Sequence, residues 1–476
     1  MDPTNGARKD GPVTAYMTAH ELVSAFLSRE LSPVEVMRET LRRVEKLNER
    51  FGVFITLSPE VALEQAKSSE RRYAAGAPAS AVDGLPLTVK DIVATRGIRT
   101  TYGSLIWRDH VPDVDAPKVE RLASAGTVLL GKTNTPEKAW KAGSGNRLIG
   151  PTRNPFDRDR TAGGSSGGAA AAAALGLGVL HQGSDGAGSI RIPASFCGVF
   201  GFKPSASLIP QAPPSAAGDI SQLGPITRTV RDAALFLDVT AGLDARDRWS
   251  YDTRNNYLGA CDGGVRGLRM AWSPDLGHAW VEPEVLRLVT AAAEVFEELG
   301  ANVVTAHPAV GDPWDIVDTI WATAHAGMHV DDFEQLRPLM DPGRVRIIER
   351  GRNIRGDVVV AMQIKRNEYY ESWRRFTEDY DVLLTPTLPI TAFEAGVDSP
   401  QRINGREPAY LEWTPFTYPF NLTGFPAATV PVGRTSAGMP VGLQIVGGFR
   451  DDAMVLRAAA AFEQARPWGF QGLDLQ

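Results

Sequence analysis

Strand-like and helix-like segments alternate along most of the chain, and this alternation limits the folds that it can adopt. Residues 84–93 (GLPLTVKDIV) and 127–133 (TVLLGKT) have the apolar pattern of strands, and residues 117–126 between them have the pattern of a helix. The same alternation returns over 267–307 and over 380–467. It predicts an α/β fold with a mixed, largely central β-sheet covered by helices on both faces.

The chain also carries signals for its organisation. Residues 18–21 and 32–35 each have the Ser/Thr-x-x-Glu pattern of a capping box, which predicts that two helices begin there. No polar linker divides the sequence. We expect one domain over 1–476, with N-terminal helices at about 18–50, a core segment at about 80–245 and a helical excursion from the sheet at about 312–378. That excursion either lines a substrate pocket or is a packing layer, and the sequence leaves both open.

Composition excludes several classes of function. The net charge is −6 without a long basic run, which does not favour nucleic-acid binding. The two cysteines, Cys197 and Cys261, lie far apart, so a reducing cytoplasm fits better than a disulfide framework. The N-terminus has no apolar core of a secretory signal, and the weakly apolar run 169–180 is too short to span a bilayer. We expect a cytoplasmic monomer or homodimer that binds neither nucleic acid nor membrane.

Two motifs match catalytic patterns in letters but not in context. Residues 126–133 (GTVLLGKT) match the phosphate-binding loop, yet their middle residues have the pattern of the strand itself, so we do not expect nucleotide binding. Residues 163–167 (GGSSG) match the nucleophile elbow, which requires an apolar strand before it, whereas a polar, turn-like segment precedes them.

The histidines and cysteines do not have the spacing of a metal site. His325 and His329 are four residues apart, a spacing that is more typical of packing when it stands alone. We expect no metal and no cofactor.

The stretch 163–194, GGSSGGAAAAAALGLGVLHQGSDGAGSIRIPA, is the most unusual part of the sequence. Its glycines permit backbone conformations closed to other residues, and its alanine block predicts a thin helix that can pack close to a sheet. In the second glycine turn, successive N–H groups can converge on an anion and serve as an oxyanion hole for a serine there. The alternative is a packing junction with surface serines. Apolar segments flank the stretch, which favours burial, and buried hydroxyls need partners.

These residues resemble the amidase signature family of serine hydrolases. The segment GGSSGG…GSDGAGSIRIPASFCGVFGFKPS carries the resemblance. Further segments match it in order over nearly the whole chain: GLPLTVKDIV, GKTNTPE, GPTRNPFD, GPITRTVRDAALFLDVTAG, TPTLP, FTYPFNLTGFPAATVPVG and GLQIVG.

The resemblance implies a Ser–cis-Ser–Lys triad. By motif position Ser189 is the nucleophile, Ser165 is a bridging serine held by a cis Gly164–Ser165 bond, and Lys90 is the terminal base. It also implies supporting roles for Ser166, Ser184 and Asp185, and an oxyanion hole made of the backbone N–H groups of Gly186, Ala187, Gly188 and Ser189. A lysine serves as base only if burial lowers its pKa; taken alone, Lys90 is equally typical of an exposed strand end.

One position departs from the family pattern. Two glycines usually precede the nucleophile, and here they are Ala187 and Gly188. If residue 187 needed a positive φ, alanine would cost about 1 kcal/mol or more. Either φ is negative there or the loop is remodelled.

The resemblance implies a hydrolase that cleaves C–N bonds of amides through an acyl-enzyme. Ile192 is typical of free-standing amidases, whereas the amidase-like component of glutamine-dependent amidotransferases usually has glutamine there. We expect aryl or apolar amides as substrates, with carbamates as a specialisation and esters as a side activity. The alternatives are such an amidotransferase component or a non-catalytic binding protein. The residues expected to line an apolar pocket are Trp140, Leu208, Ile209, Trp314, Trp321, Met328, Phe393 and Trp413, although each could instead belong to the core.

Overall fold

The N-terminal helices begin at the capping residues that the sequence predicts. The hydroxyl of Thr18 accepts the N–H of Glu21, whose carboxylate accepts the N–H of Thr18, and helix α1 (Ala19–Ser28) follows. Ser32 makes the same reciprocal pair before helix α2 (Pro33–Phe51). Each box satisfies N–H groups that have no partner within the helix.

The computed structural model describes residues 14–253, 256–470 and 472–475. The strands are β1 (Phe54–Leu57), β2 (Pro86–Lys90), β3 (Val128–Thr133), β4 (Leu180–Asp185), β5 (Phe200–Lys203), β6 (Gln222–Thr227), β7 (Arg269–Trp272), β8 (Asn302–Thr305), β9 (Val382–Pro386), β10 (Ala427–Arg434) and β11 (Pro440–Gly447). The further helices are α3 (Pro59–Ala74), α4 (Pro117–Ser124), α5 (Gly167–Ala174), α6 (Arg191–Cys197), α7 (Val230–Thr240), α8 (Tyr257–Ala260), α9 (Pro283–Glu298), α10 (Trp314–Gly327), α11 (Phe333–Leu336), α12 (Pro342–Arg352), α13 (Gly356–Asp379), α14 (Pro419–Leu422) and α15 (Asp452–Ala465).

Within the described residues, eleven strands form one sheet in the order β1-β3-β2-β4-β6-β5-β10-β11-β9-β7-β8. The pairs β2–β3 and β2–β4 are parallel, while β4–β6, β5–β6 and β10–β11 are antiparallel. The expectation of a mixed sheet is therefore confirmed. Because β2 and β4 are parallel neighbours, their carboxyl ends meet at the same edge of the sheet.

Helices cover both faces of the sheet, as predicted. In β3, Val128 and Leu130 pack with the alanines of α5, whereas Leu129 packs on the opposite face in the core that includes α4 and α7. Alternate residues of a strand point to opposite faces, so these two cores lie on the two sides of the sheet.

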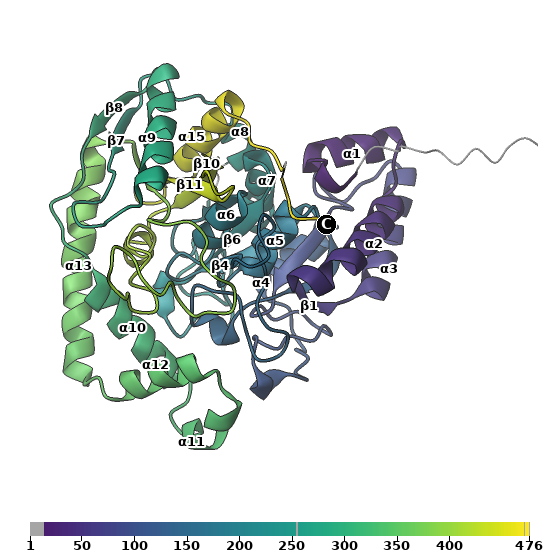
Figure 1. Cartoon of the computed structure of the whole chain (residues 1–476). Helices are drawn as coiled ribbons and strands as arrows, with labels where there is room; N and C mark the ends of the chain where they lie inside the picture. The colour runs from purple at the N-terminus through teal and green to yellow at the C-terminus, as the bar shows by residue number, and fades with distance from the viewer. Residues whose placement is uncertain (1–13, 254–255, 471, 476) are drawn as a thin grey trace, which may run out of the picture.

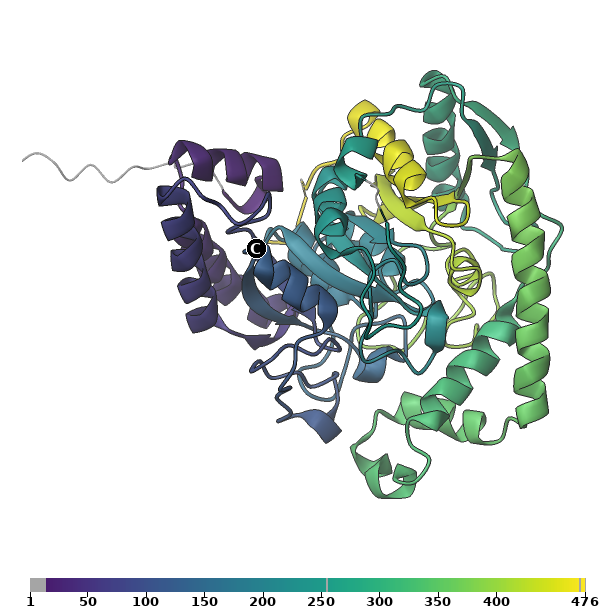
Figure 2. The same ribbon diagram turned by 180° about the vertical axis from the view of Figure 1, so that it is seen from behind.

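The two groups of peripheral helices lie at opposite ends of the molecule. Helices α1 to α3 are grouped at the end where β1 forms the edge of the sheet, and α10 to α13 are grouped at the other end in both views (Figures 1 and 2). Helix α10 packs against α12 and α13. These helices occupy the segment expected to depart from the sheet.

The two misleading motifs have the structures that their context predicts. The segment that matches the phosphate-binding loop is mainly strand β3, with all six strand residues buried. The GGSSG segment leads into α5, and no strand comes directly before it. Among the described residues, no helix has the length and apolar character needed to cross a membrane.

Candidate active site

Lys90 is the last residue of β2, and its side chain is completely buried. Its backbone N–H donates to the side-chain oxygen of Gln182 in the parallel neighbour β4, at 3.1 Å. Ser184 lies two residues further along β4. The parallel pairing therefore brings the lysine and the polar end of β4 to the same edge of the sheet.

The amine of Lys90 is surrounded by three serine hydroxyls. Nζ lies within hydrogen-bond distance of Oγ of Ser165 at 2.6 Å, of Ser166 at 2.9 Å and of Ser184 at 2.9 Å. Burial lowers the pKa of Lys90 well below its ordinary value, and the charge of Asp185 opposes that shift only in part. Burial therefore increases the fraction of neutral amine, and a neutral amine can accept a proton from a neighbouring hydroxyl.

Glycines let the two consecutive serines approach the lysine. The Gly164–Ser165 peptide bond is cis, as the resemblance implies. A Cβ on Gly164 would overlap the backbone of Gly143, and one on Gly167 would overlap the side chain of Ser144. Gly164 and Gly167 thus pack against their neighbours at distances that leave no room for a Cβ atom.

The alanine block behind these serines forms the thin helix that the sequence predicts. All residues of α5 are completely buried. The helix packs against β2, β3, β4 and β6. Ser165 and Ser166 directly precede the helix, so its packing fixes them beside these strands. Ser166 also connects this segment to β4. Its Oγ donates to the carbonyl of Ser184 at 3.1 Å and accepts the N–H of Ser184 at 3.2 Å.

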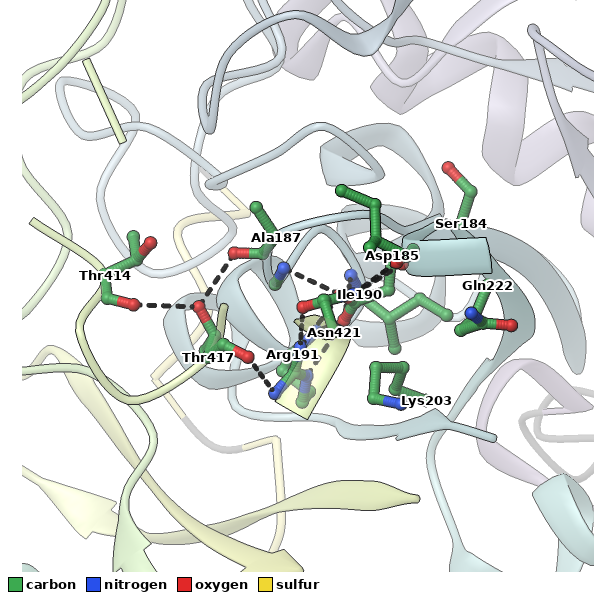
Figure 3. A network of polar contacts seen from close by, with 12 residues as sticks. Ser184, Asp185, Ala187, Ile190, Arg191, Lys203, Gln222, Thr414, Thr417 and Asn421 are labelled. Carbon is green, nitrogen blue, oxygen red and sulfur yellow. Dashed lines mark hydrogen bonds and ion pairs between the residues drawn. The ribbon is translucent and has the colours of Figure 1, made fainter. Parts of the chain in front are cut away.

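The loop that carries Ser189 joins β4 to α6, and the side chain of Asp185 contacts its backbone (Figure 3). The Asp185 carboxylate accepts the N–H of Gly188 at 2.6 Å and of Ile190 at 3.2 Å. The guanidinium of Arg191 donates to both carboxylate oxygens at 2.9 Å, and both side chains are fully buried. Although burial acts to raise it, Arg191 holds the pKa of Asp185 well below its usual range, so the pair is ionised.

Arg191 in turn reaches elements from the C-terminal part of the chain. It donates to the side-chain oxygens of Gln444 and Asn421 at 2.7 Å each, and to the carbonyl of Thr417 at 2.9 Å. Sequence reasoning did not select these three residues or Arg191. All lie in segments quoted for the resemblance, and the available signal was a polar side chain within an otherwise apolar run.

The structure corrects the expected oxyanion hole at one residue. The N–H of Gly188 is directed to Asp185, so it is not free to bind an oxyanion. Among the described residues, the backbone N–H groups of Gly186, Ala187 and Ser189 have no hydrogen-bond partner. The site thus offers three of the four expected donors.

The departure at Ala187 is also resolved. Ala187 does not have a positive φ, whereas Gly188 has φ 117°. A Cβ on Gly188 would overlap the hydroxyl of Thr417, which donates to the carbonyl of Ala187 at 2.8 Å. Only the second position therefore requires glycine.

A cavity of about 220 Å³ opens onto Ser165, Ser184, Gly186 and Ser189. Of the expected pocket residues, Trp321 and Met328 of the α10 region line it. A Cβ on Gly186 would lie 2.8 Å from the Trp321 ring, so that ring packs directly over the loop.

The other expected pocket residues lie elsewhere, which corrects the prediction. Phe393 and Trp413 pack against Phe196 in the core. Leu208 and Ile209 belong to the hydrophobic core. Trp314 packs against Tyr410 and Tyr418. Trp140 is buried, and its carbonyl accepts the Nε1–H of Trp321 at 3.1 Å. Sequence reasoning missed Tyr102, Lys138 and His325, which do line the cavity.

Comparison with known proteins identifies the family of the chain. The family model described as Amidase matches residues 35–456. An acylamidase of Rhodococcus erythropolis is 41% identical over 462 residues, covering 95% of this chain and 96% of that protein. The crystal structure of a bacterial aryl acylamidase of the amidase signature family superposes with a TM-score of 0.90 at 33% identity, covering 95% of this chain and 97% of that one. The structure of a 6-aminohexanoate cyclic dimer hydrolase superposes with a TM-score of 0.88 at 29% identity, covering 98% of this chain and all of that one. The chain therefore belongs to the amidase family and is an amide hydrolase.

Proposed function

We propose that Ser189 attacks the carbonyl carbon of an amide, with Ser165 and Lys90 moving the proton. The observation that carries this proposal is the fully buried amine of Lys90, 2.6 Å from the Ser165 hydroxyl in the cavity that also contains Ser189. A serine hydroxyl is a weak nucleophile until a base takes its proton. The lowered pKa of Lys90 supplies that base at a pH where an exposed lysine is protonated.

The reaction then passes through an acyl-enzyme. The Ser189 oxygen bonds to the carbonyl carbon, its proton passes to Ser165, and the proton of Ser165 passes to Lys90. The oxyanion binds the free N–H groups of Gly186, Ala187 and Ser189. The amine leaves with a proton returned through Ser165, and a water activated by the same relay releases the acid and restores Ser189.

Aryl or apolar amides are the proposed substrates, with carbamates and esters as further substrates. Trp321, Met328 and Ile92 give the cavity an apolar wall, and its volume of about 220 Å³ suits a compact substrate. The similarity to proteins named acylamidase and aryl acylamidase supports the same class. Esters and carbamates share the tetrahedral intermediate that the free N–H groups would stabilise.

The test combines a substrate panel with removal of the nucleophile. Ser189→Ala should abolish hydrolysis of a p-nitroanilide, an anilide, a primary amide and an aryl carbamate, read as kcat/KM, and should abolish labelling by a fluorophosphonate. Ser24→Ala, on α1 and away from the cavity, is the matched control and should behave as the parent protein. Hydrolysis that survives in Ser189→Ala would contradict the assignment.

The same panel separates the alternatives. Glutaminase activity that greatly exceeds anilide hydrolysis would favour a component of a glutamine-dependent amidotransferase. A folded protein that neither reacts with the fluorophosphonate nor turns over any substrate would favour a binding protein.

We further propose that the protein is a cytoplasmic monomer or homodimer. Its two cysteines are free and Cys197 is buried, which supports a reducing compartment. Light scattering measures the mass of the protein in solution and so distinguishes monomer from dimer.

A further inference from the structure

Lys138 lines the same cavity as Ser189, and the backbone around it is held in an unusual conformation. It lies in the short 3-10 helix Glu137–Ala139 that follows β3. Lys138 and Ala139 have φ values of 50° and 58°, in the region that favours glycine. The N–H of Lys138 donates to the carbonyl of Tyr102 at 2.8 Å. The surrounding structure thus enforces a strained turn that keeps this lysine at the cavity.

The amine of Lys138 is held between two aromatic rings. Its Nζ lies 3.6 Å from the ring centroid of Tyr102 and 3.9 Å from that of Trp107. Such contacts favour the ammonium form and keep the side chain in one position. They supply no hydrogen-bond acceptor in the usual sense, so the N–H groups remain to be satisfied.

Among the described residues, Lys138 Nζ has no hydrogen bond and no ion pair. The neighbouring carboxylate of Glu137 is already engaged, because it accepts from Ser104 Oγ at 2.9 Å and from Arg344 Nη1 at 3.0 Å. Glu137 also accepts the backbone N–H of Asp341. The amine is therefore an unused donor on a residue that lines the cavity.

No negative charge in the cavity balances this lysine. The described residues that line the cavity include no aspartate and no glutamate. His325, the other titratable nitrogen there, has a pKa lowered well below its usual value by burial and by Arg344, so it is neutral. Burial, aided by Arg344 and opposed by Glu137, lowers the pKa of Lys138 to about 7. An anion beside the amine would offset that loss of hydration.

We propose that Lys138 is a specificity-determining residue that binds a carboxylate carried by the substrate, while Ser189 receives the scissile carbonyl. The inference rests on the proposed function, because it takes the cavity beside Ser189 as the substrate site. The preferred substrates are then compact amides with one carboxylate: an anilide that bears the carboxylate on its ring, or the anilide of a dicarboxylic acid.

Matched substrates test the charge without changing the shape. 4-Acetamidobenzoate is compared with 4-nitroacetanilide, whose nitro group has the shape of a carboxylate but no charge. Succinanilic acid, with its carboxylate on the acyl side, is compared with the anilide of 4-methylpentanoic acid, whose two terminal methyl groups replace the carboxylate oxygens. For each pair, kcat and KM are measured for the parent protein and for Lys138→Met and Lys138→Arg.

Lys138→Met should reduce the ratio of kcat/KM for the anionic substrate to that for its neutral partner about 10- to 100-fold in at least one pair, mainly through KM. Lys138→Arg keeps the charge and should restore most of that ratio. Lys46→Met, at an exposed position of α2, should leave the ratio unchanged. Methionine is as strained as lysine at this φ, so any structural loss affects both substrates of a pair alike.

The two proposals fail in different ways. Equal losses on both substrates of each pair, or no loss on either, overturn the role of Lys138 while Ser189→Ala still abolishes hydrolysis. Hydrolysis that persists in Ser189→Ala overturns the proposed function itself. Failure of Lys138→Arg to restore selectivity shows that charge is not what Lys138 contributes, and so also overturns the inference.

Discussion

At the scale of single residues, burial changes the chemistry of side chains that look ordinary in sequence. Lys90 follows an apolar strand and could equally be an exposed strand end, yet it is completely buried among three hydroxyls. The backbone conformation of the catalytic loop is likewise not evident in the sequence. Of Ala187 and Gly188, only Gly188 has a positive φ. The alanine that departs from the family pattern therefore stands where the backbone conformation does not require glycine.

Replacing Lys90 with methionine should lower kcat/KM about 10²- to 10⁴-fold, because the general base is lost. In the parent protein, activity should rise with pH as Lys90 loses its proton and level off above its lowered pKa. Burial lowers that pKa and Asp185 opposes the shift, so the rise should occur well below the range of an exposed lysine. The pH dependence of kcat/KM measures this.

Lys132→Met is the control for this prediction. Lys132 is equally buried, and burial lowers its pKa to about 7, but its amine contacts Thr95 and Thr100 rather than the serines. It should alter stability without moving the pH profile. A sharp acid optimum in the parent protein, or a mild effect of Lys90→Met, would point to another base.

At the scale of elements, the catalytic loop depends on contacts between distant strands and helices. The loop between β4 and α6 is short and rich in glycine, and Arg191 connects it to α14 and β11. The segment of β4 (LHQGSD) is polar and that of β6 contains glycine and proline, so neither has the apolar alternation that predicts a strand. Their burial in the middle of the sheet makes them strands all the same.

Arg191→Met should destabilise the protein by about 3–5 kcal/mol, because Asp185 would be left buried without its counter-charge. Urea unfolding measures the loss, and activity should fall with it as the loop loosens. Arg231→Met removes an exposed pair with Asp262 and should cost less than about 1 kcal/mol. Similar free energies of unfolding for the two variants would show that the buried pair does not hold the loop.

At the scale of the whole molecule, the cavity forms where segments from distant parts of the chain meet. Ser189 comes from the loop that follows β4, and Trp321 comes from α10 in the helical segment at one end of the molecule (Figure 1). The sequence alone is compatible with that segment as a pocket wall or as a packing layer. The segment supplies both, because Trp321 lines the cavity whereas Trp314, on the same helix, packs against Tyr410 and Tyr418.

Trp321→Phe should lower kcat/KM for an anilide about 10-fold, mainly through KM, since it removes ring surface over Gly186 and the hydrogen bond to the Trp140 carbonyl. Trp314→Phe makes the same change on the same helix outside the cavity and should have a much smaller effect. Steady-state measurements of kcat and KM for the two variants test this prediction. Equal effects of the two substitutions would show that the substrate does not bind beside Trp321.

The alternating α/β architecture, the two capped N-terminal helices and the thin alanine helix could be predicted from local sequence patterns, and the grouping of the serines with Lys90 from the resemblance to a family. Each of these depends on neighbours within a few residues or on the order of a motif. The sequence could not predict which aromatics line the cavity, that the Gly188 N–H donates to Asp185, or that the Lys138 amine has no hydrogen bond or ion pair among the described residues. Arg191 and Gln444, in contact but 253 residues apart, give the reason. Burial, charge pairing and desolvation arise between segments that are distant in the chain, and local pattern carries no information about which of them meet.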